Sequence, residues 1–533
     1  MRQALGIVGG MVLGAALALA APADAKSFRW AYQGDVNSLD PYALNETFTH
    51  SFLTNVYEPL VLRDRTLNLV PGLALEWTNI EPLVWRFKLR PGVKFQDGAP
   101  FGADDVIFSY QRVTKEGSDD ASLVAAVKEV RKLDDLTVDF ITRAPDPILP
   151  QEITSWLIMS KRWAEANGAT EPSSVTKKIE NFATRNANGT GPFMVRARDP
   201  GVRTVLVPNP NWWGHVEHNL TEVVFTPITS DQTRIAALLS GDLDMMDPVP
   251  LQDLERLKAD PSIRVLQGPE LRTIFLGLDQ YRDELLYSSV KGKNPFKDRR
   301  VRLAFYQAID IEAIHTRVMH GAARPSGLMV GPGVNGYDPM IDERHPYDAV
   351  AARALLAEAG YPDGFAVTLD CPNDRYINDE RICQAVAAML ARIGVKVDLL
   401  AQTKAKYFQK VLSGNTSFHL LGWQPPSYDA HSTLFNILTT PVALAPPGAP
   451  KGQGGYNVGG YSNPKVDALT AQIGQEIDPR KRQILITEAF KLHREDVGHI
   501  PLHQQALAWG VRPNVHVVLR ADDYLDLRHV TVD

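Results

Sequence analysis

The chain has 533 residues, of which 44% are hydrophobic, so it can bury several cores and is long enough for about three domains. Its formal net charge of −6 comes from 62 acidic and 56 basic residues that are interspersed without blocks of one sign. This pattern excludes a polybasic surface, and no nucleic-acid partner is predicted.

Residues 1–25 predict a secretory signal peptide. Arg2 is a positive start, an apolar run extends from Leu5 to Ala21, and Ala23-Asp24-Ala25 has the pattern of a cleavage site. A retained membrane anchor is the alternative, but the run is shorter than the roughly 20 apolar residues that span a bilayer. No cysteine near the cleavage site can carry a lipid, so we expect a free protein in the periplasm of a Gram-negative cell.

The stretch 85–110 combines a strand, a tight turn and a helix. Apolar and basic residues alternate from 85 to 89, which is the two-residue period of a half-buried strand. Asp97-Gly98 then predicts a turn with a positive φ. A helix is predicted to follow, because Asp104-Asp105 places acidic side chains at the positive end of a helix dipole and an apolar face comes directly after them.

Helices later in the chain are predicted from their capping residues. Asp231, Asp298, Asp348 and Asp478 each stand before a segment with an apolar stripe, and an aspartate there can accept hydrogen bonds from the free N–H groups of a helix start. Gly241 is predicted to end the first of these helices. Such helices alternate with short apolar strands, so the predicted fold class is α/β.

The sequence contains two cysteines, Cys371 and Cys383, on either side of residues 372–382. Cys371 follows a strand pattern, and Cys383 lies in the first turns of a predicted helix. In an oxidising compartment we expect the two to pair and to hold the loop between them. Two separate buried thiols are the alternative, and a zinc site is not expected without a nearby histidine.

Signatures of enzymatic and metal chemistry are missing from the sequence. It contains no GxSxG, HExxH or GxxxxGK[ST] motif and no Rossmann glycine fingerprint after a strand. His499 and His503 have the spacing of metal ligands, but the residues between them predict a strand, in which positions four apart are too distant to share an ion easily. We therefore predict no enzymatic activity, no cofactor and no metal site.

Several motifs occur in the order in which one known family has them. They are WRFKLRPGVKFQDGAPFGADDVIFSY from Trp85, GDVNSLDPY from Gly34, GTGPF from Gly189, NPNWWG from Asn209, NPFKDRRVRLAFYQAID from Asn294 and YSNPKVDAL from Tyr461. The chain thereby resembles the peptide and nickel class of extracytoplasmic solute-binding proteins, family 5, which are the ligand-capture subunits of ABC importers. Together with shorter matches, these motifs extend over nearly all of the chain after the signal peptide.

The resemblance implies a two-lobe periplasmic binding-protein fold, type II-like and of cluster C, with a hinge and a ligand cleft between the lobes. The first lobe is expected to combine residues 26–62, 189–284 and 502–533. An extra domain is expected as an insertion at residues 63–188, and the second lobe at residues 285–501.

The resemblance also implies ligand contacts. Dipeptide-binding members of the family bind the peptide carboxylate with an arginine in a loop that Arg375 matches, and a guanidinium fork suits a carboxylate. They bind the amino group with an aspartate shortly after a Gly-Trp pair, but Pro426 stands at that position here. Either Asp429 takes over this role or the ligand has no free amine there. A solvated loop arginine and a turn cap are the alternative interpretations of Arg375 and Asp429.

An aromatic residue at a predicted strand end is a further candidate contact. Trp423 follows the strand-like segment 418–422 and offers a flat apolar surface, although core packing is the alternative. Tyr428 and His431 come shortly after it. The segment 441–460 is rich in Pro and Gly and predicts a surface loop that, following Trp423, can border the cleft.

The N-terminal part of the chain contributes three further candidates. The strand predicted at residues 28–32 leads into the loop 33–37, which opens onto the cleft if the family arrangement holds. We therefore expect Gln33, Asp35 and Phe48 to contact the ligand.

These observations predict the solute-binding component of an ABC importer, whose lobes close on a small solute before docking on the permease and ATPase complex of the inner membrane. The expected ligand is a short peptide or an amino-acid-like carboxylate. A nickel-type metal chelate or an oligosaccharide is the alternative within the family. Alternatives from other classes are a receptor that signals to a membrane sensor and a secreted hydrolase, which the missing motifs disfavour. A monomer is expected.

Overall fold

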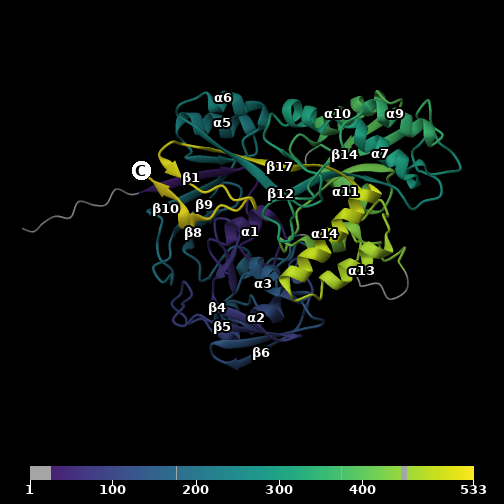
Figure 1. Ribbon diagram of the computed structural model, residues 1–533. Coiled ribbons are helices and arrows are strands. Elements are labelled where there is room, and N and C mark those ends of the chain that lie inside the picture. The colour runs from purple at the N-terminus through teal and green to yellow at the C-terminus, as the bar shows by residue number, and fades with distance from the viewer. Residues whose placement is uncertain (1–25, 176, 374, 446–452) are drawn as a thin grey trace, which may run out of the picture.

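The computed structural model describes residues 26–175, 177–373, 375–445 and 453–533, and the predicted signal peptide lies outside them (Figure 1). The largest sheet has eleven strands. Their order is β15 (Lys396–Gln402), β14 (Ala366–Pro372), β16 (Phe418–Trp423), β12 (Arg264–Leu278), β17 (Ile500–Val511), β11 (Met245–Asp247), β1 (Ser27–Tyr32), β10 (Glu222–Pro227), β9 (Arg203–Pro208) and β8 (Phe193–Asp199), and β13 (Arg324–Pro325) also pairs with β17.

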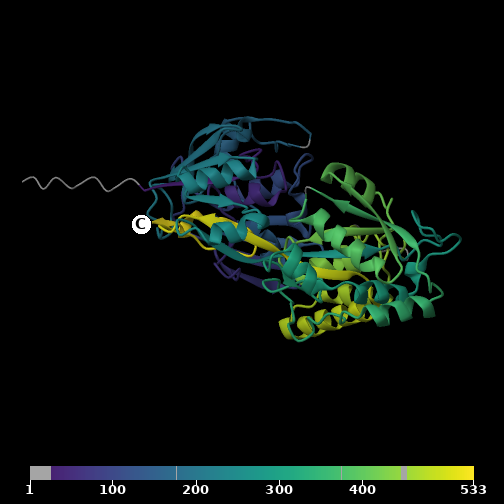
Figure 2. The same cartoon turned by 90° about the horizontal axis from the view of Figure 1, so that it is seen from above.

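Two long strands connect the halves of this sheet. β12 has 15 residues and β17 has 12, and they pair antiparallel. The C-terminal end of β17 pairs with β11, whereas the C-terminal end of β12, from Thr273 to Leu278, pairs with β16. The register of β12 against β17 is irregular between Pro269 and Thr273, which is where one half of the sheet gives way to the other. Both views show these strands passing from one side of the molecule to the other (Figures 1 and 2).

A separate antiparallel sheet lies below the large one in Figure 1, next to α2 (Ala103–Val113). Its order is β4 (Ala74–Glu81), β5 (Val84–Leu89), β7 (Thr137–Thr142) and β6 (Val127–Asp134). The strand and helix predicted within 85–110 are confirmed as β5 and α2, and Gly98 has a φ of +83°, as the predicted turn requires. The sheet falls in the range expected for the inserted domain, whose boundaries stay a prediction.

The helix starts follow the predicted caps with one exception. The side chains of Asp298, Asp348 and Asp478 accept backbone N–H groups at the starts of α7 (Arg299–Ala308), α9 (Ala349–Glu358) and α14 (Pro479–Asp496). Before α5 (Asp231–Ser240) the cap is Ser230, whose hydroxyl accepts the N–H of Thr233, so Asp231 is the first helical residue instead. Gly241 ends α5 in the left-handed conformation, as predicted.

The remaining elements complete the architecture. None of the helices within the described ranges is long and apolar enough to cross a membrane. Two small sheets pair β2 (Val61–Arg63) with β3 (Leu69–Pro71) and β18 (Val515–His516) with β19 (Thr531–Val532). The other α-helices are α1 (Thr47–Leu53), α3 (Leu149–Glu152), α4 (Lys161–Ala166), α6 (Leu254–Lys258), α8 (Ile311–Ala313), α10 (Asp379–Ala391), α11 (Lys404–Leu412), α12 (Ala430–Thr433) and α13 (Pro464–Ile473).

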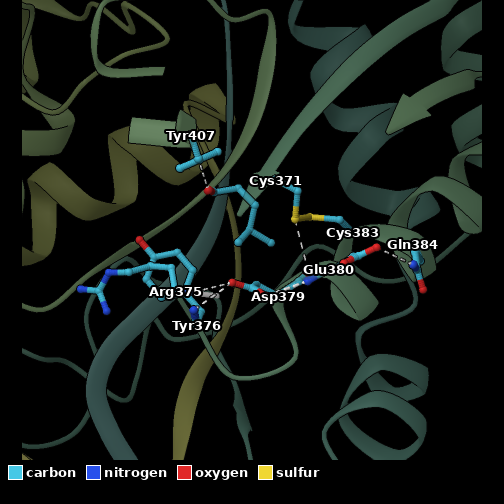
Figure 3. Close-up of a disulfide and its surroundings, with 9 residues drawn as sticks. Cys371, Arg375, Tyr376, Asp379, Glu380, Cys383, Gln384 and Tyr407 are labelled. Carbon is cyan, nitrogen blue, oxygen red and sulfur yellow. Dashed lines mark hydrogen bonds between the residues drawn. A yellow bond between two sulfur atoms is a disulfide. The ribbon is translucent and has the colours of Figure 1, made fainter. Parts of the chain in front are cut away.

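A disulfide joins Cys371 in β14 to Cys383 in α10 (Figure 3). Both side chains are fully buried in the core on this side of the sheet. The bond closes the loop that carries Arg375, so it links the position of this loop to a strand and a helix that are both packed.

Replacing both cysteines by alanine is expected to lower the free energy of unfolding by about 2–4 kcal/mol, because the cross-link restricts the unfolded chain. Urea denaturation of the variant beside the wild type measures this difference. Without reductant, neither Cys371 nor Cys383 should react with iodoacetamide in the denatured wild type, since the structure pairs both. Alkylation of either residue would contradict the disulfide.

Candidate ligand-binding site

A cavity of about 830 Å³ lies where the two halves of the large sheet meet, and it has the size of a small-molecule site. Its wall comprises the ends of β1 and β11, the irregular part of β12, the middle of β17 and the loop between β14 and α10. Charged groups of both signs line it, namely the carboxylates of Glu46, Asp231, Asp247, Glu270 and Asp523 and the guanidinium groups of Arg272, Arg375 and Arg381.

Arg375 lines this cavity from the loop after β14, and its side chain is exposed to the solvent there. The backbone N–H groups of Arg375 and Tyr376 donate to Oδ2 of Asp379, which fixes the loop at the start of α10 (Figure 3). The guanidinium carbon lies 5.0 Å from the centre of the Tyr376 ring. In the described part of the chain, no side chain or carbonyl accepts a hydrogen bond from this guanidinium.

The electrostatic surroundings of Arg375 favour an anion. Partial desolvation by the surrounding cavity walls and the positive charge of Arg272 lower the pKa of Arg375. Both effects act against the charged form, and a bound carboxylate would offset both. Arg375 therefore has the geometry and the charge of an anion-binding residue.

Sequence reasoning missed a polar network at the irregular part of β12. Nε of Arg272 donates to Oε1 of Glu270 at 3.2 Å, and its NH2 group donates to Oε1 of Gln424 at 2.9 Å. Nε2 of Gln505 in β17 donates to the other Glu270 oxygen at 2.5 Å. These residues line the cavity because the ladder between β12 and β17 is interrupted here, which no local sequence pattern indicates.

Asp247 and Asp523 were also missed, although both line the cavity. Asp247 is the last residue of β11 and stands before Pro248, and an acidic residue at a strand end was the one available signal. Asp523 belongs to the segment that follows β17 and has a φ of +63°, for which the sequence offered no signal.

Asp429 does not lie where it could bind the ligand's amino group at the large cavity. Its carboxylate accepts bonds of 2.7 and 2.8 Å from the two terminal nitrogens of Arg482 and one of 2.6 Å from Asn335. It also caps α12 by accepting the N–H of His431 at 2.8 Å. The side chain is fully buried and does not line the cavity. The Arg482 guanidinium already neutralises its carboxylate.

The aromatic candidates are not gathered at the cavity. Trp423 ends β16 as expected, but its ring packs on Tyr456 with the centres 5.0 Å apart, outside the cavity wall. His431 is half-buried beside Phe435, and desolvation lowers its pKa to about 4, so it is neutral at physiological pH.

Tyr428 and Pro426 line a smaller chamber of about 180 Å³ that shares Arg272 and Arg375 with the large cavity. The Tyr428 hydroxyl donates to Asp522 at 3.3 Å. Tyr428 thus reaches the neighbourhood of Arg375 by way of this chamber, with its hydroxyl group already engaged.

Of the N-terminal candidates, only Gln33 lines the large cavity. Asp35 instead accepts the N–H of Gly201 at 2.7 Å and holds a neighbouring loop. Phe48 is 5% exposed and stacks on Tyr32 with ring centres 3.8 Å apart, so it belongs to the core.

His499 and His503, whose spacing resembles that of metal ligands, do not lie in a cluster of metal-ligating groups within the described residues. Nδ1 of His499 lies 3.0 Å from Nε2 of His493, while both ring nitrogens of His503 are buried without a partner in the described structure. No group of three or more His, Cys, Asp or Glu residues suited to a metal ion occurs among residues 26–175, 177–373, 375–445 and 453–533.

A comparison with protein families decides between the classes that this cavity allows. The model of bacterial extracellular solute-binding proteins, family 5 Middle, matches residues 68–443, which is more than half of the chain. The chain belongs to this family. The predicted resemblance is confirmed, and members of family 5 are substrate-binding proteins of transporters, a class distinct from enzymes.

Relatives align with most of this family 5 protein. The periplasmic murein peptide-binding protein MppA of Escherichia coli (strain K12) is 25% identical over 498 residues, with 89% of this chain and 87% of the relative covered. The dipeptide-binding protein of the same strain is 27% identical over 451 residues, with 79% and 81% covered. The structure of HbpA2 from Haemophilus parasuis gives a TM-score of 0.80 at 24% identity over 95% of this chain and 100% of that chain. The predicted two-lobe α/β fold is confirmed.

Proposed function

We propose that this family 5 protein is the periplasmic solute-binding component of an ABC importer and that it captures a short peptide or an amino-acid-like carboxylate. The observation that carries the ligand class is Arg375, a guanidinium without a described acceptor in a cavity of about 830 Å³. The names of the murein peptide-binding and dipeptide-binding relatives support the same class. The predicted signal peptide supports the periplasmic location.

Capture requires no bond to be broken. β12 and β17 connect the two halves of the sheet, and the cavity lies at this connection. Ligand contacts made to both halves would shift an equilibrium between open and closed forms toward the closed form. The closed form would then dock on the permease and ATPase complex as a monomer.

The alternative ligands have less support. A neutral sugar offers Arg375 no carboxylate, and Trp423, the aromatic residue expected at the ligand, packs on Tyr456 outside the cavity. A metal chelate that carries carboxylates would also need an anion-binding group, so Arg375 alone does not distinguish it from a peptide. The titration described next distinguishes the two.

Isothermal titration with a pool of dipeptides tests the proposal. We expect saturable binding of one peptide per protein. The same pool with amidated C-termini should bind at least about tenfold more weakly, because it offers Arg375 no carboxylate. Equal binding of both pools would contradict recognition of the carboxylate, and no binding of either pool would contradict the peptide class.

A further inference from the structure

Three carboxylates on the wall of the large cavity influence one another, and only one of them is compensated. Asp247 ends β11, Glu270 lies in β12, and Asp523 follows β17. Both oxygens of Glu270 accept hydrogen bonds, one from Arg272 and one from Gln505. Glu270 is therefore satisfied within the protein.

Asp247 lacks such a partner. Its side chain is buried, with 5% of the residue exposed, and it lines the cavity, yet no residue in the described ranges donates a hydrogen bond to its carboxylate. Arg234 is the positive group whose field reaches it. However, the terminal nitrogens of Arg234 donate to the carbonyls of Ile228 and Thr229 and to Asp231, at 2.6, 3.1 and 2.5 Å.

Asp523 is only partly satisfied. Its Oδ1 accepts one hydrogen bond of 3.2 Å from Nε1 of Trp509, and no other donor to this carboxylate occurs in the described structure. An unpaired charge at a buried position costs several kcal/mol by order of magnitude, so such a group either takes up a proton or gains a partner.

The protonation behaviour of the two aspartates agrees with this arrangement. Burial, with the field of Glu270, raises the pKa of Asp247 to about 7. Burial and the charges of Asp247 and Glu270 also raise the pKa of Asp523. The other charged or titratable groups that face the pair are Tyr32 of β1, Arg234 of α5, Arg272 of β12 and Asp522 beside Asp523. Part of the negative charge is therefore neutralised by protons at neutral pH when no cation is bound.

We propose that Asp247 and Asp523 form a subsite for a positively charged group of the solute, an ammonium or a guanidinium. This subsite rests on the proposed function and adds to it an orientation of the ligand, with the carboxylate at Arg375 and the positive group at Asp247 and Asp523. Asp247 belongs to the half of the sheet that contains β1, and Arg375 to the half that contains β14. A solute with a carboxylate for Arg375 and an amine for Asp247 therefore contacts both halves at once. Pro426 can then replace an aspartate without leaving the amine unpaired.

Four forms of one dipeptide pool test the subsite by isothermal titration, with the amine free or acetylated and the carboxylate free or amidated. In the wild type, acetylation should weaken binding at least about tenfold, as amidation does. Weakening by amidation alone would overturn the cation subsite and leave the proposed function intact. Failure of all four forms to bind would overturn both.

Single variants locate the effect. Asp247→Asn and Asp523→Asn should each weaken the pool with a free amine at least about fivefold and leave the acetylated pool unchanged. Asp242→Asn is the matched control, because it removes the same charge from an exposed position that does not line the cavity. The subsite is wrong if no folded cavity variant changes the ratio of the affinities for the free-amine and acetylated pools. One folded variant is sufficient for this test.

Proton release provides an independent measurement on the wild type. A bound cation favours the ionised aspartates, so binding should release protons at about pH 7, and affinity should rise with pH through the raised pKa of Asp247. Titrations in phosphate and in Tris, which differ in ionisation enthalpy, measure the number of protons. Release should occur with the free-amine pool and disappear with the acetylated pool, and equal release with both would contradict the subsite.

Discussion

Replacing Arg375 by alanine is expected to weaken the binding of peptides with a free carboxylate by at least about tenfold, which corresponds to the loss of one charge-assisted hydrogen-bonded pair. The amidated peptides should lose little affinity, because they make no such pair. Since the guanidinium contacts no acceptor among the described residues, the melting temperature should stay close to that of the wild type. Titration of both pools, with a thermal melt of each protein, measures these quantities.

Two further variants sharpen this prediction. Arg375→Lys keeps the charge but loses the planar fork, so it should bind carboxylates with intermediate affinity. Arg392→Ala is a matched control at the exposed C-terminal end of α10, outside the cavity wall, and should bind like the wild type. Unchanged affinity of Arg375→Ala for the free carboxylate would remove Arg375 from the site.

Replacing Arg482 by methionine is expected to lower the free energy of unfolding by about 3–5 kcal/mol, because it leaves the Asp429 carboxylate charged in a buried position. Asp429 is fully buried and Arg482 is 6% exposed in its side chain, so water can do little to replace the lost partner. Urea denaturation with the wild type alongside measures the change.

The double variant Asp429→Asn/Arg482→Met should recover a large part of this loss, since it removes the unpaired charge. Arg480→Met changes an exposed arginine of the same helix and should alter stability by no more than about 0.5 kcal/mol. If Arg482→Met were as stable as the wild type and instead changed the preference for free-amine peptides, Asp429 would belong to the ligand site after all.

Helices and strands whose signals lie within a few consecutive residues were predictable from the sequence. The alternation at 85–89 became β5, and the aspartate caps of α7, α9 and α14 occur where the pattern placed them. Each of these signals acts over a few residues, through strand periodicity or through a side chain that accepts a nearby N–H group. The one shifted cap, Ser230 in place of Asp231, is an error of a single position between two residue types that both cap well.

The candidate site was predictable only in part. Arg375 and Gln33, which the sequence predicted as ligand contacts, both line the cavity, and both stand in loops directly after strands. Glu270, Arg272 and Asp523 were not predictable, because they meet at an interrupted ladder between two strands that are far apart in the sequence. Phe48 was expected at the ligand, but its ring completes a core of aromatic side chains instead.

The sequence by itself determined the family, the α/β alternation and the loop that presents Arg375, because motif order and local capping are properties of the linear chain. Only the tertiary structure decided which acidic residues are available to a ligand. Asp429 and Asp247 look alike in the sequence, but a guanidinium 53 positions away neutralises Asp429, whereas Asp247 lines the cavity with no described donor. The charge of a buried carboxylate depends on the partners that folding brings to it, and these partners are distant in the sequence.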